Sequence, residues 1–458
     1  MKIRSHAFVK KDFRTKWYKK WAKELKQDES HLDNHDLYAN KFWQNAIMAE
    51  ILTERGVLNN GAKAVGFGVG KERLPAVFAR HGVHVTATDQ DFSEKKAGYW
   101  AKHELATGAQ SLNELGICDP TKFNELVGYM HLDMNSIPAK LHDSYDFLWS
   151  NCALGHLGNI DKGLKFIENS LRCLVPGGWA VHTTELNILS DKSTVESGNT
   201  VLFRIKDIYS LQKKLLELWY VSEPFRLTFG TSPSDNEVSI NPAFGNGYSK
   251  IQVMGHLCTQ IVLIIHKPIK EVSNMKKARL RMQYKKSYEA NKLSISRYRK
   301  LNKTIRSILK SQDAPTSTIN VFPMKYKYKL ILKQGTKESV YILYKNNSKV
   351  PLFSLYCRLG SSLPIALATS SPNDRKSKFH DDSWTGNNRN RPSIALNEDK
   401  DGKLQPANYI KVGQDFGFEV TLHANKVQKG TYKEVFSLVQ EGRGWVDNSA
   451  VEVTVEVE

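Results

Sequence analysis

Three glycines at alternate positions mark the part of the chain whose residue types could bind a nucleoside. Gly66, Gly68 and Gly70 follow a short apolar segment at 62–65 that predicts a strand, and a helical pattern follows them. Glycines let the backbone turn tightly and lie close to a ligand. The next predicted strand ends in Asp89, where a carboxylate can accept hydrogen bonds from two ribose hydroxyls.

The residues after the glycines separate two kinds of ligand. A dinucleotide site favours G-x-G-x-x-G, which holds a pyrophosphate at the start of a helix. In this chain the third glycine comes one residue early, and Lys71-Glu72-Arg73 follows it. We expect Glu72 in the first turn of the helix, where its carboxylate would repel a diphosphate. A cationic sulfonium ligand would not be repelled.

Candidate catalytic side chains lie at the ends of later predicted strands. His156 follows the strand at 145–152, and an imidazole titrates in the range that suits a general base. Glu185 ends the strand at 179–185 and could bind a substrate hydroxyl or orient His156. Alternatively, His156 caps a helix or bonds a loop. We expect His182 to be buried packing.

The elements around these residues alternate between strand and helix patterns. Segments 62–65, 83–89, 145–152 and 179–185 are strand-like, and helical segments lie between several of them. This alternation predicts an α/β domain with a parallel, doubly wound, Rossmann-like sheet and a ligand outside the carboxyl ends of its strands. A helix is predicted at 38–56. Its Phe42 and Trp43 are expected in the core, with a lid over the cofactor as the alternative.

These motifs together resemble the class I S-adenosylmethionine-dependent methyltransferases. Residues 66–70 resemble the glycine motif of that family, residues 131–134 its next acidic motif, and segments 145–158 and 174–185 its later strands. Two positions depart from the family pattern, Ala64 and Gly155, where many members carry acidic residues. The resemblance implies S-adenosyl-L-methionine as cofactor, and it implies as cofactor-binding residues Gly66, Phe67, Gly68, Gly70, Asp89, Asp133, Met134 and Asn151.

The net charge of +19 is concentrated in two segments. Residues 1–35 hold ten Lys or Arg against five Asp or Glu, and residues 270–312 hold fourteen against two. The remaining chain is therefore nearly neutral, which disfavours a nucleic-acid partner at the cleft. Within the second segment, Tyr288, Ile295 and Tyr298 lie on heptad-like positions. We expect a basic helix with a solvated face, and residues 276–310 could contact an anionic membrane surface or a second copy.

Four parts are predicted: a basic N-terminal arm at 1–35, the methyltransferase domain at 36–269, a basic helical linker at 270–315 and a β-sandwich at 316–458. The last resembles bacterial immunoglobulin-like domains through residues 372–379, Trp384 with Arg389, and 430–445. Such domains occur on enzymes of surface-polysaccharide assembly. Trp384, Arg389 and Trp445 could stack on sugars, but we expect the tryptophans to fill the core.

The sequence therefore predicts an S-adenosylmethionine-dependent methyltransferase that methylates a hydroxyl of a sugar or similar small acceptor in cell-surface polysaccharide biosynthesis. The alternatives are a nucleic-acid methyltransferase, an inactive cofactor-binding scaffold suggested by Gly155, and a membrane-surface adaptor. The five cysteines form no C-x-x-C pair, so no metal site is expected. They favour a cytoplasmic location, with the inner face of the membrane as a second expectation.

Overall fold

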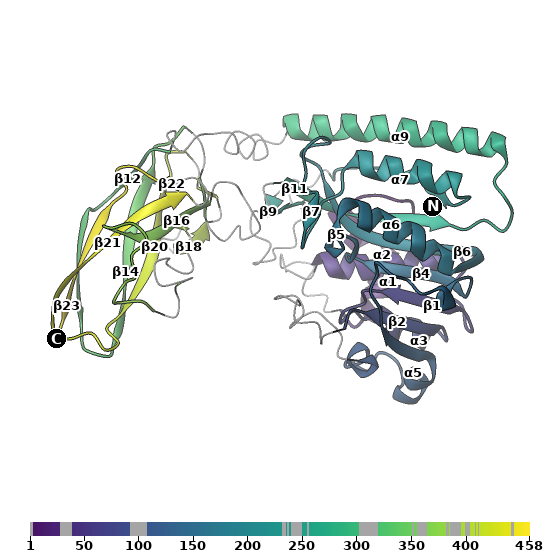
Figure 1. Cartoon of the computed structure of the whole chain (residues 1–458), viewed down its shortest axis with the longest axis horizontal. Coiled ribbons are helices and arrows are strands. Elements are labelled where there is room, and N and C mark those ends of the chain that lie inside the picture. Colours follow the sequence, from purple (N-terminus) through teal and green to yellow (C-terminus); the bar gives the residue numbers. More distant parts are fainter. Residues whose placement is uncertain are drawn as a thin grey trace. The chain divides into compact units, whose positions relative to one another are not determined.

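The computed structural model divides the chain into two compact bodies, one built mainly from residues up to Leu301 and the other mainly from the residues after it (Figure 1). The structure describes residues 3–27, 39–91, 108–230, 235, 238–239, 250–253, 256–301, 319–349, 352–354, 364–381, 384, 395–398, 404–407, 409–410, 412–440 and 444–458. Among these residues, no helix is both long and apolar enough to cross a bilayer.

The first body is built on one mixed sheet in which five neighbouring strands are parallel, in the order β3-β2-β1-β4-β6. The chain runs outward from β1 to β3 and returns to place β4 beside β1. The carboxyl ends of β1 and β4 are therefore the switch point, the place at which doubly wound sheets bind ligands. The five strands are β1 (Lys63–Phe67), β2 (His84–Asp89), β3 (Val127–His131), β4 (Tyr145–Asn151) and β6 (Leu174–Asn187).

One strand departs from the expected all-parallel sheet. Strand β11 (His256–His266) runs antiparallel to β6, and β8 (Val221–Ser222) pairs with its other edge. A parallel partner would need a crossover, usually a helix, between β8 and β11. Strand β11 instead runs opposite to both β6 and β8.

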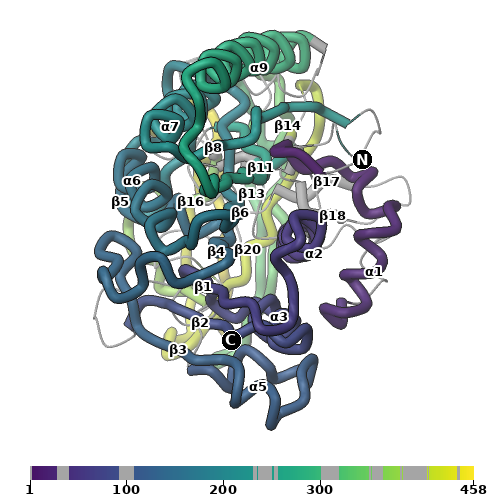
Figure 2. Tube along the Cα trace, turned by 90° about the vertical axis from the view of Figure 1, so that its right-hand side faces the viewer, coloured from purple at the N-terminus to yellow at the C-terminus, as the bar shows by residue number. Residues whose placement is uncertain are grey.

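Helices cover both faces of the sheet, and Figure 2 shows α1, α2 and α3 on one side of the strands and α6, α7 and α9 on the other. Apolar side chains of α2, such as Trp43 and Ile47, pack against Phe147 and Trp149 of β4 in one core. The helices of the body are α1 (Lys16–Glu24), α2 (Ala39–Glu54), α3 (Leu74–Arg80), α5 (Pro120–Leu126), α6 (Ile160–Ser170), α7 (Ile205–Glu217) and α9 (Asn274–Leu301).

Short elements complete the first body. The two-residue strands β5 and β7 pair with each other antiparallel. The 3-10 turns of this body are η1 (Lys10–Arg14), η3 (Ala109–Leu112), η4 (Ala139–Leu141), η5 (Leu154–His156) and η6 (Leu171–Cys173), and its paired short strands are β5 (Gly158–Asn159) and β7 (Ser197–Gly198). The strand order of the sheet continues after β11 with β10 (Lys250–Val253) and β9 (Val238–Ser239).

The N-terminal segment is part of the first core, which corrects its interpretation as a basic arm. Phe8 and Trp21 are fully buried, and the backbone N–H of Phe8 donates to the carbonyl of Gln260 in β11 at 2.8 Å. The lysines of α1, such as Lys19 and Lys23, point to solvent. The charge of this segment therefore covers an amphipathic helix whose aromatic face belongs to the domain.

Helix α9 also belongs to the first body, so the described part of the predicted linker at 270–315 is not a linker. Tyr284 is fully buried against the body, and its hydroxyl donates to the carbonyl of Ser222 at 2.7 Å. The amide of Asn291 donates to the carbonyl of Phe225, and the ring of Tyr288 stacks on Tyr209 of α7. The heptad-like stripe is therefore covered by the helix's own domain. Ile305 and Leu309, on the same stripe, lie outside the described residues.

The second body is a β-sandwich. Its two sheets have the orders β12-β14-β20-β17-β18 and β13-β23-β21-β16-β15-β19, and β22 pairs with β21. Most pairs are antiparallel, but β13 with β23 and β15 with β16 are parallel, which the sequence pattern did not predict. The strands are β12 (Val321–Pro323), β13 (Lys327–Leu332), β14 (Lys337–Asn346), β15 (Leu352–Ser354), β16 (Pro364–Ser370), β17 (Ala395–Glu398), β18 (Leu404–Ala407), β19 (Tyr409–Ile410), β20 (Asp415–His423), β21 (Gly430–Gln440), β22 (Gly444–Trp445) and β23 (Val451–Val457).

Aromatic side chains fill the space between the two sheets. Trp384 is buried in the shared core beside Phe436, and its indole N–H donates to the carbonyl of Thr421 at 2.8 Å. Trp445 is half-buried and packs on a small cluster that includes Val439. The expectation that Trp384 fills the core is confirmed, and Arg389 lies outside the described residues.

Candidate active site at the strand ends of the first body

The glycine loop leaves β1 and passes through a narrow space. Gly68 has a φ of +62°, and a Cβ on it would lie 2.8 Å from Cβ of Ala153 and 3.2 Å from Sδ of Met134. The loop therefore brings the predicted residues Gly68 and Met134 into contact. Gly66 has a different role from the expected one, because a Cβ there would overlap the indole of Trp149 rather than a ligand.

Two carboxylates predicted to bind the nucleoside flank this loop. Asp89 is 5% exposed, and its Oδ2 accepts a hydrogen bond from the backbone N–H of Gly70 at 2.8 Å. Its Oδ1 accepts from the N–H of Gln90. Asp133, just beyond β3, is exposed and accepts from the N–H of Asn135. The carboxylate of Asp89 therefore fixes the backbone at the end of the glycine loop and at the end of β2.

Glu72 is held by two side chains of β4. Its Oε1 accepts from the indole N–H of Trp149 at 2.5 Å, and its Oε2 accepts from the amide of Asn151 at 3.1 Å. Burial raises the pKa of Glu72 to about 7, although these hydrogen bonds and the charge of Lys41 favour the ionised form. Glu72 precedes α3 and does not lie in its first turn, because the helix begins only at Leu74.

Asn151, predicted to contact the cofactor, is part of a buried network. Its amide nitrogen donates to Asn45 as well as to Glu72, and its Oδ1 accepts from the hydroxyl of Thr183 at 2.9 Å. The side chain of Phe67, also on the predicted list, is fully buried and packs on Phe166. Phe67 therefore offers its backbone, not its ring, to this edge of the sheet.

Helix α2 contributes polar residues that the sequence reasoning missed. Phe42 and Trp43 are buried as expected, but Gln44 and Asn45 face the strand ends. The amide of Gln44 donates to Oε1 of Gln260 at 2.7 Å. Within the described part of the chain, Oε1 of Gln44 has no hydrogen-bond partner although it is buried. Two adjacent amides inside an otherwise apolar helical run were the signal that could have identified them.

Glu185 is linked to Gln44 of α2 through the side chain of Gln260. The thiol of Cys152 donates to Oε1 of Gln260 at 3.1 Å, and the amide of Gln260 donates to Oε1 of Glu185 at 2.8 Å. Burial, together with the charge of Glu185, raises the pKa of the Cys152 thiol well above its ordinary value, so the thiol is a neutral donor. Cys152 has a φ of +55°, an uncommon conformation for a side-chain-bearing residue that occurs where β4 ends.

The two predicted catalytic residues, Glu185 and His156, have different surroundings. A Cβ on Gly155 would lie 4.0 Å from Oε2 of Glu185 and 3.1 Å from the carbonyl of Val201, so the second oxygen of Glu185 faces this turn. His156 is exposed, and its Nδ1 lies 2.8 Å from the carbonyl of Asn199. A carbonyl only accepts, so Nδ1 carries the hydrogen and the ring is tied to a loop. No described hydrogen bond joins His156 to Glu185.

His182 is a core residue, as expected. It is fully buried, its Nδ1 lies 2.8 Å from the hydroxyl of Ser150, and its ring meets Phe166 edge-on. Burial lowers its pKa to about 3. It is therefore neutral at physiological pH, and its side chain is not accessible to a substrate from solvent.

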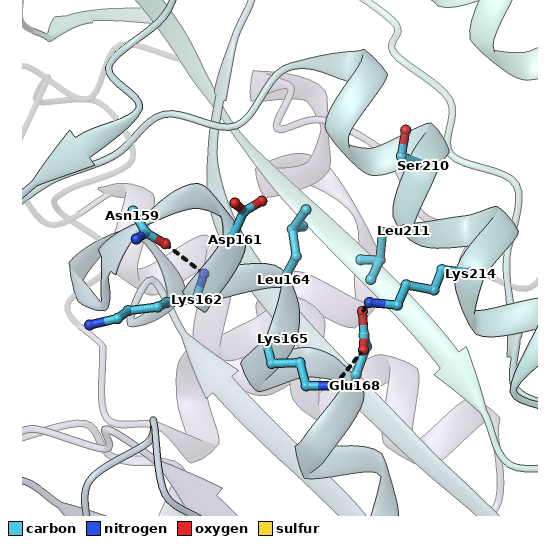
Figure 3. Close-up of a pocket in the computed structure, with 9 residues that line it drawn as sticks. All are labelled: Asn159, Asp161, Lys162, Leu164, Lys165, Glu168, Ser210, Leu211 and Lys214. Atoms are coloured by element: carbon cyan, nitrogen blue, oxygen red, sulfur yellow. Dashed lines mark hydrogen bonds and ion pairs between the residues drawn. The ribbon is translucent and has the colours of Figure 1, made fainter.

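A surface cavity of about 460 Å³ lies elsewhere, between α6 and α7 (Figure 3). Its most prominent side chain is Glu168, which pairs with Lys165 at 3.2 Å and Lys214 at 2.5 Å. Asn159 caps α6 by accepting from the N–H of Lys162. The pair between Glu168 and Lys214 joins α6 to α7, and the other two contacts lie within α6 and at its start. None of the lining residues belongs to the strand-end network, so we assign the chemistry to the network.

Comparison with known proteins gives similarity only at the level of solved structures. No protein-family model and no curated protein matches the chain. An S-adenosylmethionine-dependent methyltransferase from Methanosarcina mazei is 14% identical over 48% of this chain and 98% of its own, with a TM-score of 0.31. One from Mesorhizobium loti is 13% identical over 48% and 97%, with a TM-score of 0.28.

A third solved structure contains ligands. The 1,6-didemethyltoxoflavin-N1-methyltransferase from Burkholderia thailandensis, with bound 1,6-didemethyltoxoflavin and S-adenosylhomocysteine, is 14% identical over 57% of this chain and 91% of its own, with a TM-score of 0.30. The assignment of a Rossmann-like α/β fold rests on the strand order and register described above.

Proposed function

We propose that the first body is an S-adenosylmethionine-dependent methyltransferase. The observation that carries this proposal is the position of Glu72 directly after the glycine loop, held by Trp149 and Asn151, while Asp89 lies at the end of the neighbouring strand. In a dinucleotide site the pyrophosphate occupies the region next to the glycine loop. A carboxyl group fixed there repels a diphosphate. It favours a ligand that carries a positive charge on the group attached to its ribose, as a sulfonium does.

The residues present fit S-adenosylmethionine in two further respects. The close approach of Gly68 to Met134 and Ala153 forms a cradle that a Cβ would fill. The buried Oε1 of Gln44, which has no hydrogen-bond partner among the described residues, offers an acceptor to a donor group such as an ammonium. We assign the nucleoside to Asp89, Asp133 and Met134 and the charged end of the cofactor to Glu72 and Gln44, with Gly66, Gly68, Gly70 and the backbone of Phe67 forming the loop.

For the acceptor we propose a hydroxyl group of a sugar or similar small molecule. Bound S-adenosylmethionine supplies an electrophilic methyl group, so the protein must position the acceptor and receive its proton. We assign proton removal to Oε2 of Glu185, because the amide of Gln260 fixes Oε1 and leaves Oε2 directed toward Gly155. His156, tied to a loop carbonyl, is then a residue of the acceptor rim.

A place in cell-surface polysaccharide biosynthesis is the finer part of the proposal. It is supported by the resemblance of the second body to immunoglobulin-like domains of polysaccharide-assembly enzymes, and by the location of the basic charge. Much of that charge lies on the outer sides of α1 and α9 and not in the strand-end network, where Glu72, Asp89 and Glu185 lie. This distribution favours a small neutral acceptor over a nucleic acid, and we place the reaction in the cytoplasm.

The test is to incubate the full chain with S-adenosylmethionine labelled in its methyl group and extracts enriched in glycan intermediates or nucleotide sugars. We expect label in a glycan fraction that is resistant to nuclease. Glu185→Gln should lower the transfer about 100-fold or more, while Glu125→Gln, which changes an exposed carboxylate on α5, should leave it unchanged. Label recovered only in nucleic acid, or equal transfer by both variants, would contradict the proposal.

A further inference from the structure

One side of helix α9 packs against its own domain, and the opposite side is exposed to solvent. At 3.6 residues per turn, Tyr284, Asn291 and Ile295 lie on the side opposite to Met282 and Leu293. The first three are 0%, 5% and 7% exposed, whereas Met282 and Leu293 are 72% and 51% exposed. The helix therefore presents one side to its own domain and the other to solvent over 28 residues, about 42 Å.

The outer face combines aliphatic and cationic side chains. Met275, Met282 and Leu293 form its central line, and Met275 is 83% exposed. Four exposed cations lie within about 40° of that line, on a helix of 3.6 residues per turn: Arg279, Lys286, Arg297 and Lys300. Among the described residues, none of these four makes an ion pair, and Glu289 is the one acid on the face. We call these seven apolar and cationic residues the outer stripe.

We propose that the outer stripe docks the protein on an anionic membrane surface, with its cations at lipid headgroups and its aliphatic side chains at the start of the acyl region. Anionic headgroups attract cationic side chains, and apolar side chains at the membrane surface are buried at the boundary with the acyl region. The cations complement the negative charge of the headgroups. Insertion removes the apolar side chains of Met275, Met282 and Leu293 from water, which is favourable. This proposal does not depend on the methyl-transfer reaction.

The same face is poorly suited to the other candidate partners. Bases of single-stranded nucleic acids stack on aromatic rings, but Tyr284, Tyr288 and Tyr298 of α9 contact its own domain. A second copy packed along the outer stripe would bring Arg279 and Lys286 against like charges. The sequence indicates two alternative partners for residues 276–310, an anionic membrane surface and a second copy. We therefore choose the membrane surface, and we assign the contact to the outer stripe.

The test is flotation of the full chain with vesicles of phosphatidylcholine alone or with 30% phosphatidylglycerol. We expect binding to the anionic vesicles that weakens in high salt. R279E/K286E/R297E should lower the partition coefficient about 100-fold or more. The matched control K16E/K19E/K23E, which changes three exposed lysines of α1, should lower it less than tenfold.

A second pair of variants tests the aliphatic part. M282S/L293S should lower partitioning about tenfold without changing the melting temperature, whereas L115S, at another exposed leucine, should have no effect. Equal binding by M282S/L293S and the native chain would overturn insertion. Retention on duplex DNA or RNA at a salt concentration that releases the vesicles, or a dimer that M282S/L293S dissociates, would assign the stripe to those partners instead.

Discussion

Replacing Glu72 by glutamine should change how the stability of the first body depends on pH. Burial raises the pKa of this carboxyl from 4.5 to about 7. Between these two values the folded protein binds more protons than the unfolded chain, so the free energy of unfolding falls as pH rises through that window. Glu72→Gln removes the titrating group and should flatten this part of the profile.

The magnitude follows from the two pKa values. At about 1.4 kcal/mol per pKa unit, the full difference corresponds to on the order of 3 kcal/mol between pH 4 and pH 8. Glu72 keeps part of its surface in solvent, which reduces the effect, and we expect about 1–2 kcal/mol. Glutamine also weakens the contact with Asn151 at every pH, by about 1 kcal/mol, so the informative quantity is the difference between pH values.

Denaturant unfolding of the native chain and the variant at pH 5 and pH 8 measures this difference. The native chain should lose about 1–2 kcal/mol more than Glu72→Gln over this interval, and Glu125→Gln should behave like the native chain. The same carboxyl should make S-adenosylmethionine bind more tightly as it ionises, and this gain should be smaller in Glu72→Gln. Parallel stability profiles for the native chain and Glu72→Gln would refute the buried-carboxyl reasoning.

The remaining predictions concern catalysis and the packing of α9. Glu185→Gln should lower turnover about 100-fold or more with nearly unchanged cofactor affinity, whereas His156→Ala should lower it less than tenfold; steady-state kinetics and calorimetry compare them. The reverse order would return the base to His156. Tyr284→Phe should cost about 1 kcal/mol of stability by denaturant unfolding, because the carbonyl of Ser222 loses its donor. A chain ending at Leu301 should unfold cooperatively, whereas one ending at residue 270 should not; equal calorimetric transitions would show that α9 is dispensable.

Local patterns in the sequence predicted the elements that hold the site. A short apolar strand segment, the glycines after it and the helix that follows are all encoded within about 30 residues, as the segment from Lys63 to Asp89 shows. The strand-end positions of Asp89 and Asn151 follow from the same patterns. These patterns did not indicate that the amide nitrogen of Asn151 donates its hydrogen bonds to Glu72 and Asn45.

Long-range contacts account for the rest of the site. Gln44 and Gln260 are 216 positions apart and meet only because α2 crosses the strand ends beside β11. No periodicity records such a pairing. In the same way, the stripe through Tyr288, Ile295 and Tyr298 indicates that one side of this helix is buried, but periodicity does not identify what covers it. A helix of a second copy could have covered this side. In the structure, the first body of the same chain covers it.

The central claim is that the site at the strand ends of the first body binds S-adenosylmethionine and not a dinucleotide. Calorimetric titration of the full chain with S-adenosylmethionine and with NADH tests this claim most directly. We predict binding of the first ligand and none of the second. Asp89→Ala should weaken the affinity at least tenfold, because a ribose hydroxyl pair loses its charged acceptor, while Asp161→Ala on α6 should leave it unchanged. Tight NADH binding by the native chain, or unchanged S-adenosylmethionine affinity in Asp89→Ala, would contradict the account.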